Sequence, residues 1–521
     1  MADTAKVKEF VEETWYKDCV PKLKEYIEIP NLSPYFTSDA NKDEARENQD
    51  KAMKLIKEWV EAQDLQGADL KLYEEEGRTP LLFVEVAATE GVDVEESGTV
   101  LLYGHMDKQP PFTGWEEGLE PYKAVEKNGK LYGRGGADDG YSVFCAVTAL
   151  RALQKQGCPH GRCVIIVEAC EESGSPDLPF YIEKLKDQIG SPNLIVCLDS
   201  GCGNYEQLWI TTSLRGVVVG KLTVEHTTEG VHSGDASGII PDTFRIARQV
   251  LDRFEDAQTG KILLPKLNVE VPEKYQEQVA TCAQVLGKAG LIDCFPFLEG
   301  AQPTTTDEGK DQLTELALNR WWRPQLSYVG AAGLPSADSA GNVLRPSTTL
   351  ALSCRLPPTL ETEGVQDAMR KCFESDPPYG SKISFVSEKI GGGWAAPEVA
   401  PWLENAAHAA SKAYYGKEAV YMGEGGSIPF MGMLGKMFPK AQFLIIGVLG
   451  PGSNAHGPNE FLHLDFSAKL TCCVASVVGD HCKSKVEAML KSSNSGEPAA
   501  KKAKVEELNE NFGRNPDGTK L

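Results

Sequence analysis

Three short segments of the chain place His, Asp or Glu side chains directly after apolar, strand-like runs. They are residues 104–107, 133–140 and 171–174. Asp199 follows the apolar run 194–198, and His456 follows the apolar run 443–448. Open α/β sheets gather their functional groups at the carboxyl ends of their strands. Together these segments predict an active site.

The residue types in these segments favour a metal site. Imidazole and carboxylate groups bind Zn²⁺ and similar ions, and a two-metal hydrolase needs a carboxylate that bridges ions about 3.5–4 Å apart. The chain offers candidate ligands of these types at five positions: His105, Asp138 or Asp139, Glu171 or Glu172, Asp199 and His456. A lone His at a strand end is usually structural, but five ligands at five such positions favour a metal centre.

Two more carboxylates suit supporting and catalytic roles. Asp107 lies two residues after His105, which on an extended strand puts both side chains on one face. A carboxylate there can hold the imidazole in its metal-binding tautomer. Glu171 and Glu172 are neighbours at a strand exit and point in different directions. One of them can bind metal while the other takes a proton from water.

Size and composition exclude several function classes. The chain has 521 residues, which predicts about two to four domains. Its formal charge of −22 argues against nucleic acid or an anionic membrane as partner, since phosphate binding needs a basic surface. No apolar run approaches the ~18–20 residues of a membrane span, and the first residues lack the apolar core of a signal peptide. We therefore expect a cytoplasmic protein with its 14 cysteines reduced.

The secondary-structure pattern predicts an α/β fold with an insertion. Strand-like runs at 81–87, 99–103, 164–168 and 194–198 alternate with helical patterns, as in a mixed sheet flanked by helices. After residue 213 the pattern changes, and it returns to α/β after residue 358. We expect a catalytic domain of residues 1–213 and 359–490 and an inserted α+β domain of residues 214–358. Residues 491–521 are expected to be a disordered tail, because they have too few apolar side chains to offset ordering.

In this order the segments resemble the M20 metallopeptidase family, and within it the dipeptidase branch of cytosolic non-specific dipeptidases and carnosinase-like enzymes. The resemblance runs from the first predicted helix to about residue 490 and includes residues 318–324 and 424–429. It implies a di-zinc exopeptidase-like catalytic domain and an inserted lid domain through which two subunits form a homodimer. Mn²⁺ and Co²⁺ suit the same ligands.

The resemblance also implies a role for each site residue. Asp138 bridges two metal ions. His105 and Asp199 complete one metal site, and Glu172 and His456 complete the other. Glu171 is the general base and Asp107 supports His105. The peptide bond between Asp138 and Asp139 is cis in the family.

The resemblance also implies which residues bind the substrate. His232 matches a histidine that reaches the active site of the partner subunit and polarises the scissile carbonyl. Asn342, Arg355 and Ser427 match positions that hold the substrate, and a guanidinium suits a free C-terminal carboxylate. The resemblance therefore implies a small peptide as substrate.

The chain departs from the family pattern at one position, and two alternatives to a dipeptidase function are considered. The family usually has Asp-Asp-Lys-Gly where this chain has Asp138, Asp139, Gly140 and Tyr141, so a lysine is missing. The first alternative is an aminoacylase or carboxypeptidase acting on N-acylated amino acids. The second is a catalytically silent protein that keeps the fold for binding. A catalytically silent protein usually lacks a metal ligand or the general base, whereas this chain has every one of these residues.

Overall fold

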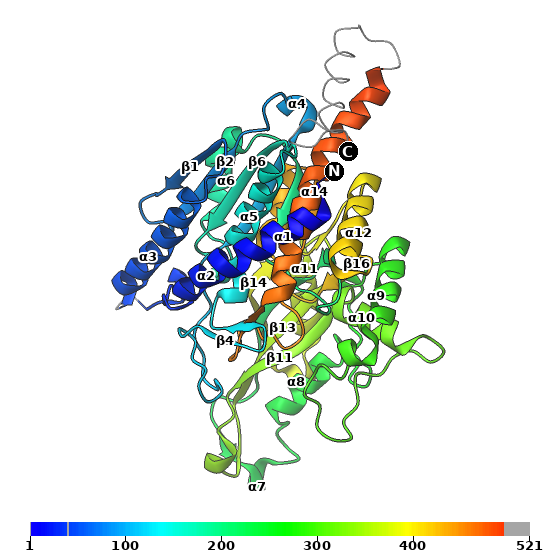
Figure 1. Ribbon diagram of the computed structural model, residues 1–521. Coiled ribbons are helices and arrows are strands. Elements are labelled where there is room, and N and C mark those ends of the chain that lie inside the picture. Colours follow the sequence, from blue (N-terminus) through cyan, green and yellow to red (C-terminus); the bar gives the residue numbers. More distant parts are fainter. Residues whose placement is uncertain (1, 39–40, 494–521) are drawn as a thin grey trace. The chain divides into compact units, whose positions relative to one another are not determined.

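A computed structural model describes residues 2–38 and 41–493 of the chain (Figure 1). Its contacts divide the chain into two compact units, which we call unit 1 and unit 2. Unit 1 consists of Met1–Thr211, Ala396–Val420 and Met433–Leu521, and unit 2 consists of Thr212–Ala395 and Tyr421–Gly432. Unit 1 is therefore discontinuous in sequence.

Unit 1 is built on a six-stranded mixed sheet in the order β1-β2-β6-β3-β7-β17. Its strands, in sheet order, are Ala68–Tyr73, Leu81–Val86, Arg162–Glu168, Thr99–His105, Pro192–Cys197 and Gln442–Ile445. The pairs β6–β3, β3–β7 and β7–β17 are parallel, whereas β1–β2 and β2–β6 are antiparallel. The four central strands are almost continuously apolar, as expected of strands buried on both faces.

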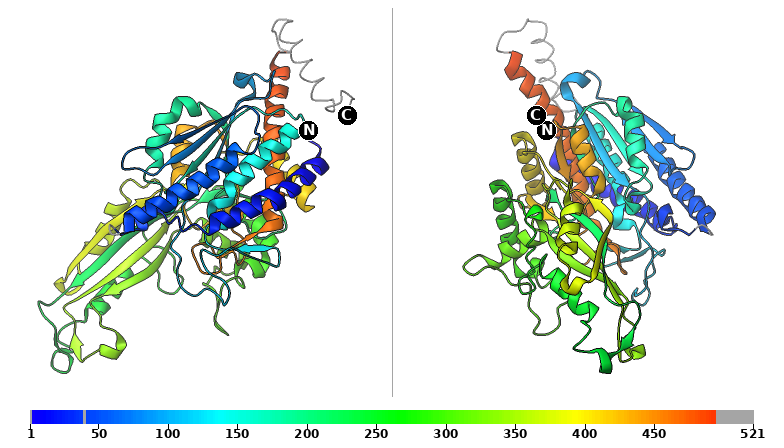
Figure 2. Two further views of the ribbon diagram at one scale, coloured as in Figure 1. Left: turned by 60° about the vertical axis from the view of Figure 1, so that its left-hand side comes forward. Right: turned by 180° about the vertical axis from the view of Figure 1, so that it is seen from behind.

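Helices cover both faces of this sheet. In the sheet, β6 and β7 lie on either side of β3. The chain passes from β3 through α5 (Tyr141–Lys155) to β6, and then in the opposite direction from β6 through α6 (Leu178–Ile189) to β7. Because such crossovers are right-handed, opposite directions of travel place α5 and α6 on opposite faces. Figure 2 shows the sheet between them. The ends of β3, β6 and β7 therefore meet at one edge of the sheet.

Further elements of unit 1 surround this layer. The helices are α1 (Thr4–Thr14), α2 (Val20–Ile27), α3 (Lys42–Glu61), α4 (Val94–Ser97), α12 (Pro401–Tyr415) and α14 (Leu464–Ser493), and a small sheet contains β4 (Val125–Lys127), β5 (Lys130–Tyr132) and β18 (Phe461–His463). Trp59 of α3 packs against Phe144 of α5, with ring centroids 4.5 Å apart. Of the expected tail, residues 491–493 end α14, and residues 494–521 lie outside the described part of the chain.

Unit 2 contains a four-stranded antiparallel sheet in the order β11-β13-β9-β14. Its strands, in that order, are Gln325–Ala332, Ser347–Leu356, Gly216–Glu225 and Lys382–Gly391. The remaining elements of unit 2 are β10 (Val231–His232), β12 (Val343–Leu344), α7 (Ser233–Ala236), α8 (Thr243–Leu251), α9 (Glu273–Leu291), α10 (Gln312–Trp321) and α11 (Val365–Glu374). β8 (Trp209–Leu214), β15 (Trp394–Ala395), β16 (Val420–Glu424) and α13 (Pro429–Met437) lie at the junctions of the two units.

The predicted end of the inserted domain at residue 358 is wrong. Helix α11 puts Val365, Met369 and Phe373 into the apolar core of unit 2, and β14 pairs with β9 along its length. The second boundary therefore lies at Ala395. The α/β pattern after residue 358 misled the prediction because an amphipathic helix has the same sequence pattern whichever core it covers. None of the helices described, from α1 to α14, is long and apolar enough to cross a membrane.

Candidate metal centre

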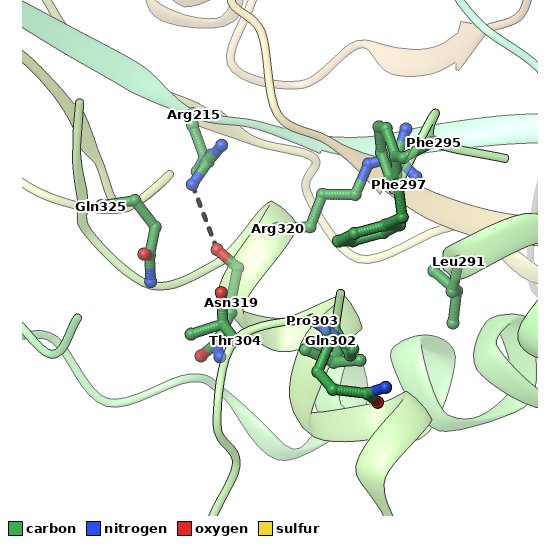
Figure 3. Close-up of a pocket in the computed structure, with 11 residues that line it drawn as sticks. Arg215, Leu291, Phe295, Phe297, Gln302, Pro303, Thr304, Asn319, Arg320 and Gln325 are labelled. Atoms are coloured by element: carbon green, nitrogen blue, oxygen red, sulfur yellow. Dashed lines mark hydrogen bonds between the residues drawn. The ribbon is translucent and has the colours of Figure 1, made fainter. Parts of the chain in front are cut away.

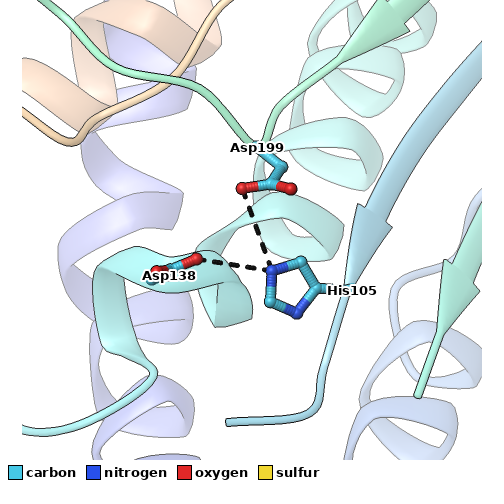
Figure 4. A group of neighbouring side chains, drawn as sticks. All are labelled: His105, Asp138 and Asp199. Carbon is cyan, nitrogen blue, oxygen red and sulfur yellow. Dashed lines mark ion pairs between the residues drawn. The ribbon is translucent and has the colours of Figure 1, made fainter. Parts of the chain in front are cut away.

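His105 is the last residue of β3, and carboxylates hold its ring from two sides. Its backbone N–H donates to Asp139 Oδ2 at 3.1 Å. Its Nδ1 lies 3.4 Å from Asp107 Oδ1, and its Nε2 lies 3.4 Å from Asp138 Oδ1 and 3.8 Å from Asp199 Oδ1 (Figure 4). Asp107 can thus orient the ring through one nitrogen while the other faces two carboxylates.

A second group of ligands shares one carboxylate with the first. His456 Nε2 lies 3.1 Å from Asp138 Oδ2 and 3.2 Å from Glu172 Oε2. The ligand atoms of His105, Asp138 and Asp199 lie within 4.8 Å of one another, as do those of Asp138, Glu172 and His456. One oxygen of Asp138 faces each histidine, which is the arrangement that a bridging carboxylate needs.

Two of these residues do not follow strands directly, contrary to the sequence-based expectation. Asp138 lies in a helical turn, Gly136–Gly140, that leads into α5. His456 lies in the loop between β17 and β18 and has a left-handed backbone, with φ of 65°. The peptide bond between Asp138 and Asp139 is cis, as the resemblance predicts. The side chain of Asp138 lies next to His105 and His456, whereas that of Asp139 accepts from the backbone N–H at the end of β3.

The donor set fits divalent cations. Nε2 of His105 and Oε1 of Glu172 are buried without a hydrogen-bond partner among the described residues, so each group contains an unsatisfied ligand atom. Burial raises the pKa of Asp199, and repulsion from Glu171 raises it further. Burial alone would lower the pKa of His105, but the neighbouring carboxylates raise it well above its usual value. Several buried carboxylates lie close together around two imidazoles, and bound cations would stabilise them by offsetting their mutual repulsion.

Glu171 precedes Glu172 in the chain but belongs to neither ligand group. Asp107 fixes the backbone on both sides of Glu171. Oδ1 of Asp107 accepts from the Glu171 N–H at 3.0 Å, and Oδ2 of Asp107 accepts from the Glu172 N–H at 3.1 Å. Burial raises the pKa of Glu171 well above its usual value, and the charges of Glu172 and neighbouring carboxylates add to this rise. A carboxylate with a raised pKa is suited to accept and return a proton near neutral pH.

Sequence reasoning missed a buried ion pair that joins the two ligand loops. Glu460 Oε1 accepts from the backbone N–H groups of Gly135, Ala137 and Asp138 at 2.9, 3.3 and 3.3 Å. Its Oε2 pairs with Arg134 Nη1 at 2.5 Å, and both side chains are almost fully buried. Glu460 lies in the same loop as His456, so it ties that loop to the turn that carries Asp138. A pair 326 residues apart gives no local sequence signal.

Lys108 is a second buried charge that sequence reasoning missed. Its side chain has no exposed surface, and its Nζ donates to the carbonyl oxygens of Tyr26, Ile27 and Ile29 at 2.9, 3.2 and 2.7 Å. Burial lowers the pKa of Lys108 well below its usual value. The carbonyls of Tyr26 and Ile27 end helix α2, and that of Ile29 lies just beyond it; a cation is favourable at such a helix end. Lys108 therefore fixes the exit of β3, which carries His105 and Asp107, to that helix end.

The structure explains the glycine that replaces the family lysine after Asp139. A Cβ atom at Gly140 would overlap the Cε1 atom of Tyr26 and lie 2.5 Å from the carbonyl oxygen of Gly135. The hydroxyl of Tyr26 donates to the carbonyl oxygen of Met106, and its ring lies 4.2 Å from the Nζ of Lys108. The tyrosine thus occupies the space that a side chain at position 140 would need.

Gly140→Ala is expected to destabilise the protein by about 1–3 kcal/mol, the usual cost of overpacking a filled site. Urea denaturation of the variant measures this loss. Gly341→Ala is the matched control, because a Cβ atom at Gly341 meets nothing within 4 Å. Equal free energies of unfolding for the two variants would refute the steric role of Tyr26.

The four residues expected to bind substrate all belong to unit 2. His232 ends β10 and pairs with Val343 of β12, and Ser233 N–H donates to Asn342 O at 2.9 Å, so His232 and Asn342 are neighbours. The side chain of His232 is 67% exposed. Arg355 lies in β13, and Ser427 lies between β16 and α13. Within the described residues, no hydrogen bond or ion pair joins Arg355 or Ser427 to His232 or Asn342.

Known dipeptidases are similar to this chain in sequence. The chain is 26% identical over 367 residues to the cysteinylglycine-S-conjugate dipeptidase of Corynebacterium striatum, covering 70% of this chain and 77% of that protein. It is 29% identical over 383 residues to the human Beta-Ala-His dipeptidase, covering 70% of this chain and 71% of that protein. Both relatives are dipeptidases by name.

Structure and family comparison agree with these similarities. The crystal structure of human carnosine dipeptidase 1 has the same fold, with a TM-score of 0.70 and 22% identity, over 92% of this chain and 99% of that one. Residues 101–480 match the model of peptidase family M20/M25/M40, and this segment contains all five residues of the two ligand groups. The match covers well over half of the chain, which therefore belongs to peptidase family M20/M25/M40.

Proposed function

We propose that the protein is a metal-dependent dipeptidase that hydrolyses dipeptides and other small peptides with a free C-terminal carboxylate. One observation carries the proposal: Asp138 presents one oxygen to the histidine of each ligand group, and Glu171 belongs to neither group but lies near enough to interact with the charges of His105, Glu172 and Asp199. The similarity to two relatives named as dipeptidases supports the choice of substrate class.

The proposal includes two metal sites. His105, Asp138 and Asp199 would hold one ion, and Asp138, Glu172 and His456 would hold the other. We propose Zn²⁺ for both, since imidazole and carboxylate ligands suit it, as they also suit Mn²⁺ and Co²⁺. When bound, such ions supply Lewis acidity and lower the pKa of water at the site.

The residues of the chain would move the proton. Glu171 accepts a proton from the attacking water, whose oxygen then forms a bond to the scissile carbonyl carbon. When the C–N bond breaks, Glu171 returns the proton to the leaving amine. Asp107 keeps this base in place through the two backbone N–H groups that it accepts, and it orients the ring of His105.

Residues of unit 2 would bind the substrate. The guanidinium of Arg355 would hold the C-terminal carboxylate, and Asn342 and Ser427 would position the peptide. We also propose a cytoplasmic homodimer in which His232 of one subunit polarises the scissile carbonyl in the site of the other. The exposed side chain of His232 is consistent with a role outside its own subunit.

Paired substrates test the proposed function. The enzyme, loaded in turn with Zn²⁺ and Mn²⁺, is expected to hydrolyse Ala-Leu and to be much less active on N-acetyl-Ala-Leu and on N-acetyl-leucine. Amino acid analysis of the products measures each rate. A strong preference for the acetylated compounds would replace the dipeptidase assignment by an aminoacylase or carboxypeptidase.

A further inference from the structure

Three arginines of unit 2, Arg215, Arg320 and Arg355, lie close enough together for their charges to interact, and none has an acidic partner among the described residues. The ion pairs of the described residues include none with Arg215, Arg320 or Arg355, although the whole chain has 75 acidic and only 53 basic residues. Arg215 is only 8% exposed. A buried arginine usually pairs with a carboxylate, so this cluster has positive charge available for an anion from outside the chain.

The guanidinium of Arg215 is fixed in place without being neutralised. Its Nε donates to the carbonyl oxygen of Gly425 at 3.3 Å, and its Nη1 donates to those of Asn319 and Arg323 at 3.1 and 3.3 Å. Burial, together with the nearby charges of Arg355 and Arg320, lowers the pKa of Arg215 to about 10. The carbonyl groups orient the side chain, and its positive charge remains.

A cavity of about 350 Å³ lies beside this cluster (Figure 3). Arg215 and Arg320 line it together with the amides of Asn319 and Gln325, and the rings of Phe295 and Phe297 form part of its apolar wall. No Asp or Glu is among the described residues that line it. The cavity thus offers positive charge, amide donors and apolar surface, which suit a short aliphatic chain that ends in a carboxylate.

The cavity and Arg355 are neighbours on the same sheet. Gln325 of β11 pairs directly with Arg355 of β13 in antiparallel register. Directly paired residues point to the same face, with Cβ atoms about 4.5–5.5 Å apart. A peptide whose α-carboxylate is bound by Arg355 would therefore have the side chain of its C-terminal residue beside Gln325, at the cavity.

We infer that this cavity is the subsite for the substrate's C-terminal side chain and that it selects glutamate or aspartate there. Arg355 takes the α-carboxylate, and Arg320 and Arg215 face the carboxylate of the side chain. The inference rests on the proposed dipeptidase function. A local positive field in a protein of net charge −22 would also draw in a doubly negative substrate end.

Isosteric dipeptides test the subsite directly. The metal-loaded enzyme is expected to hydrolyse Ala-Glu with a kcat/KM about tenfold above that for Ala-Gln, the usual effect of one charge-assisted hydrogen bond. Arg320 is exposed, so Arg320→Gln and Arg320→Glu should fold. Arg320→Gln should lower the Ala-Glu to Ala-Gln ratio about tenfold, and Arg320→Glu should lower it further. Arg248→Gln is the control, an exposed arginine of α8 outside the cavity, and should keep the wild-type ratio.

Binding without turnover separates the subsite from the proposed function. Isothermal titration of the Glu171→Gln variant should show Ala-Glu bound more tightly than Ala-Gln, and the difference should disappear when Arg320→Gln is added. A wild-type ratio of one or less, or an unchanged ratio in Arg320→Gln, would overturn the subsite. If the wild type hydrolyses neither dipeptide, the dipeptidase assignment fails, and the titration still decides whether the cavity selects an acidic side chain.

Discussion

Glu171→Gln is expected to lower kcat on a dipeptide by about 10²–10⁴-fold, the contribution of a positioned general base. Glutamine has nearly the same shape but cannot accept the proton. Glu171 belongs to neither ligand group, and Asp107 holds it through the backbone, so the variant should keep its metal. The expected result is therefore a folded, metal-loaded and nearly inactive protein.

Two comparisons make this result specific. Elemental analysis of Glu171→Gln should match the wild type, whereas Glu172→Gln should contain less metal, because Glu172 belongs to the ligand group with His456. Glu117→Gln changes an exposed glutamate and should leave the rate unchanged. Wild-type turnover in Glu171→Gln would exclude Glu171 as the base.

Arg134→Met is expected to destabilise the protein by about 3–5 kcal/mol, the cost of leaving one partner of a buried ion pair unpaired. Burial already raises the pKa of Glu460 to about 7 against the opposing charge of Arg134. Without the arginine, Glu460 becomes a buried carboxylate with no ion-pair partner. Its loop and the turn that carries Asp138 would then be held less firmly, so weaker metal binding should accompany the lower stability.

A double-mutant cycle measures this pair. The free energy of unfolding in urea should fall much less for Arg370→Met, which removes an exposed pair with Asp367 worth at most about 1 kcal/mol. Adding Glu460→Gln to Arg134→Met should restore part of the lost stability, because it removes the unpaired charge. If Arg134→Met costs no more than Arg370→Met, the pair does not support the site.

Most of the proposed metal ligands could be predicted because local sequence and topology both point to them. His105 ends β3, Asp199 lies two residues after the end of β7, and Glu171 and Glu172 follow β6, so the parallel order of these strands brings them together. Asp138 lies in a turn and His456 in a loop, and the choice of Asp138 over Asp139 needed the resemblance to a family. The structure places all five in two groups that share Asp138.

Other parts of the site depend on contacts that no local pattern shows. Glu460 and Arg134 pair across most of the chain, and Lys108 binds carbonyl oxygens of residues that lie 79 to 82 positions earlier in the sequence. Gly140 is explained only by the ring of Tyr26, which belongs to a helix more than a hundred residues earlier. The domain boundary at Ala395 likewise follows from which core α11 covers, which its amphipathic sequence leaves open.

Titration of metal into chelator-treated enzyme, with hydrolysis of Ala-Leu as the readout, tests the central claim most directly. Two ligand groups that share Asp138 predict that the rate rises with added Zn²⁺ or Mn²⁺ and reaches its plateau at about two equivalents per chain. The Glu171→Gln variant should bind the same two equivalents and remain nearly inactive. Undiminished hydrolysis by the metal-free wild type, or no hydrolysis after full loading, would contradict the assignment as a two-metal dipeptidase.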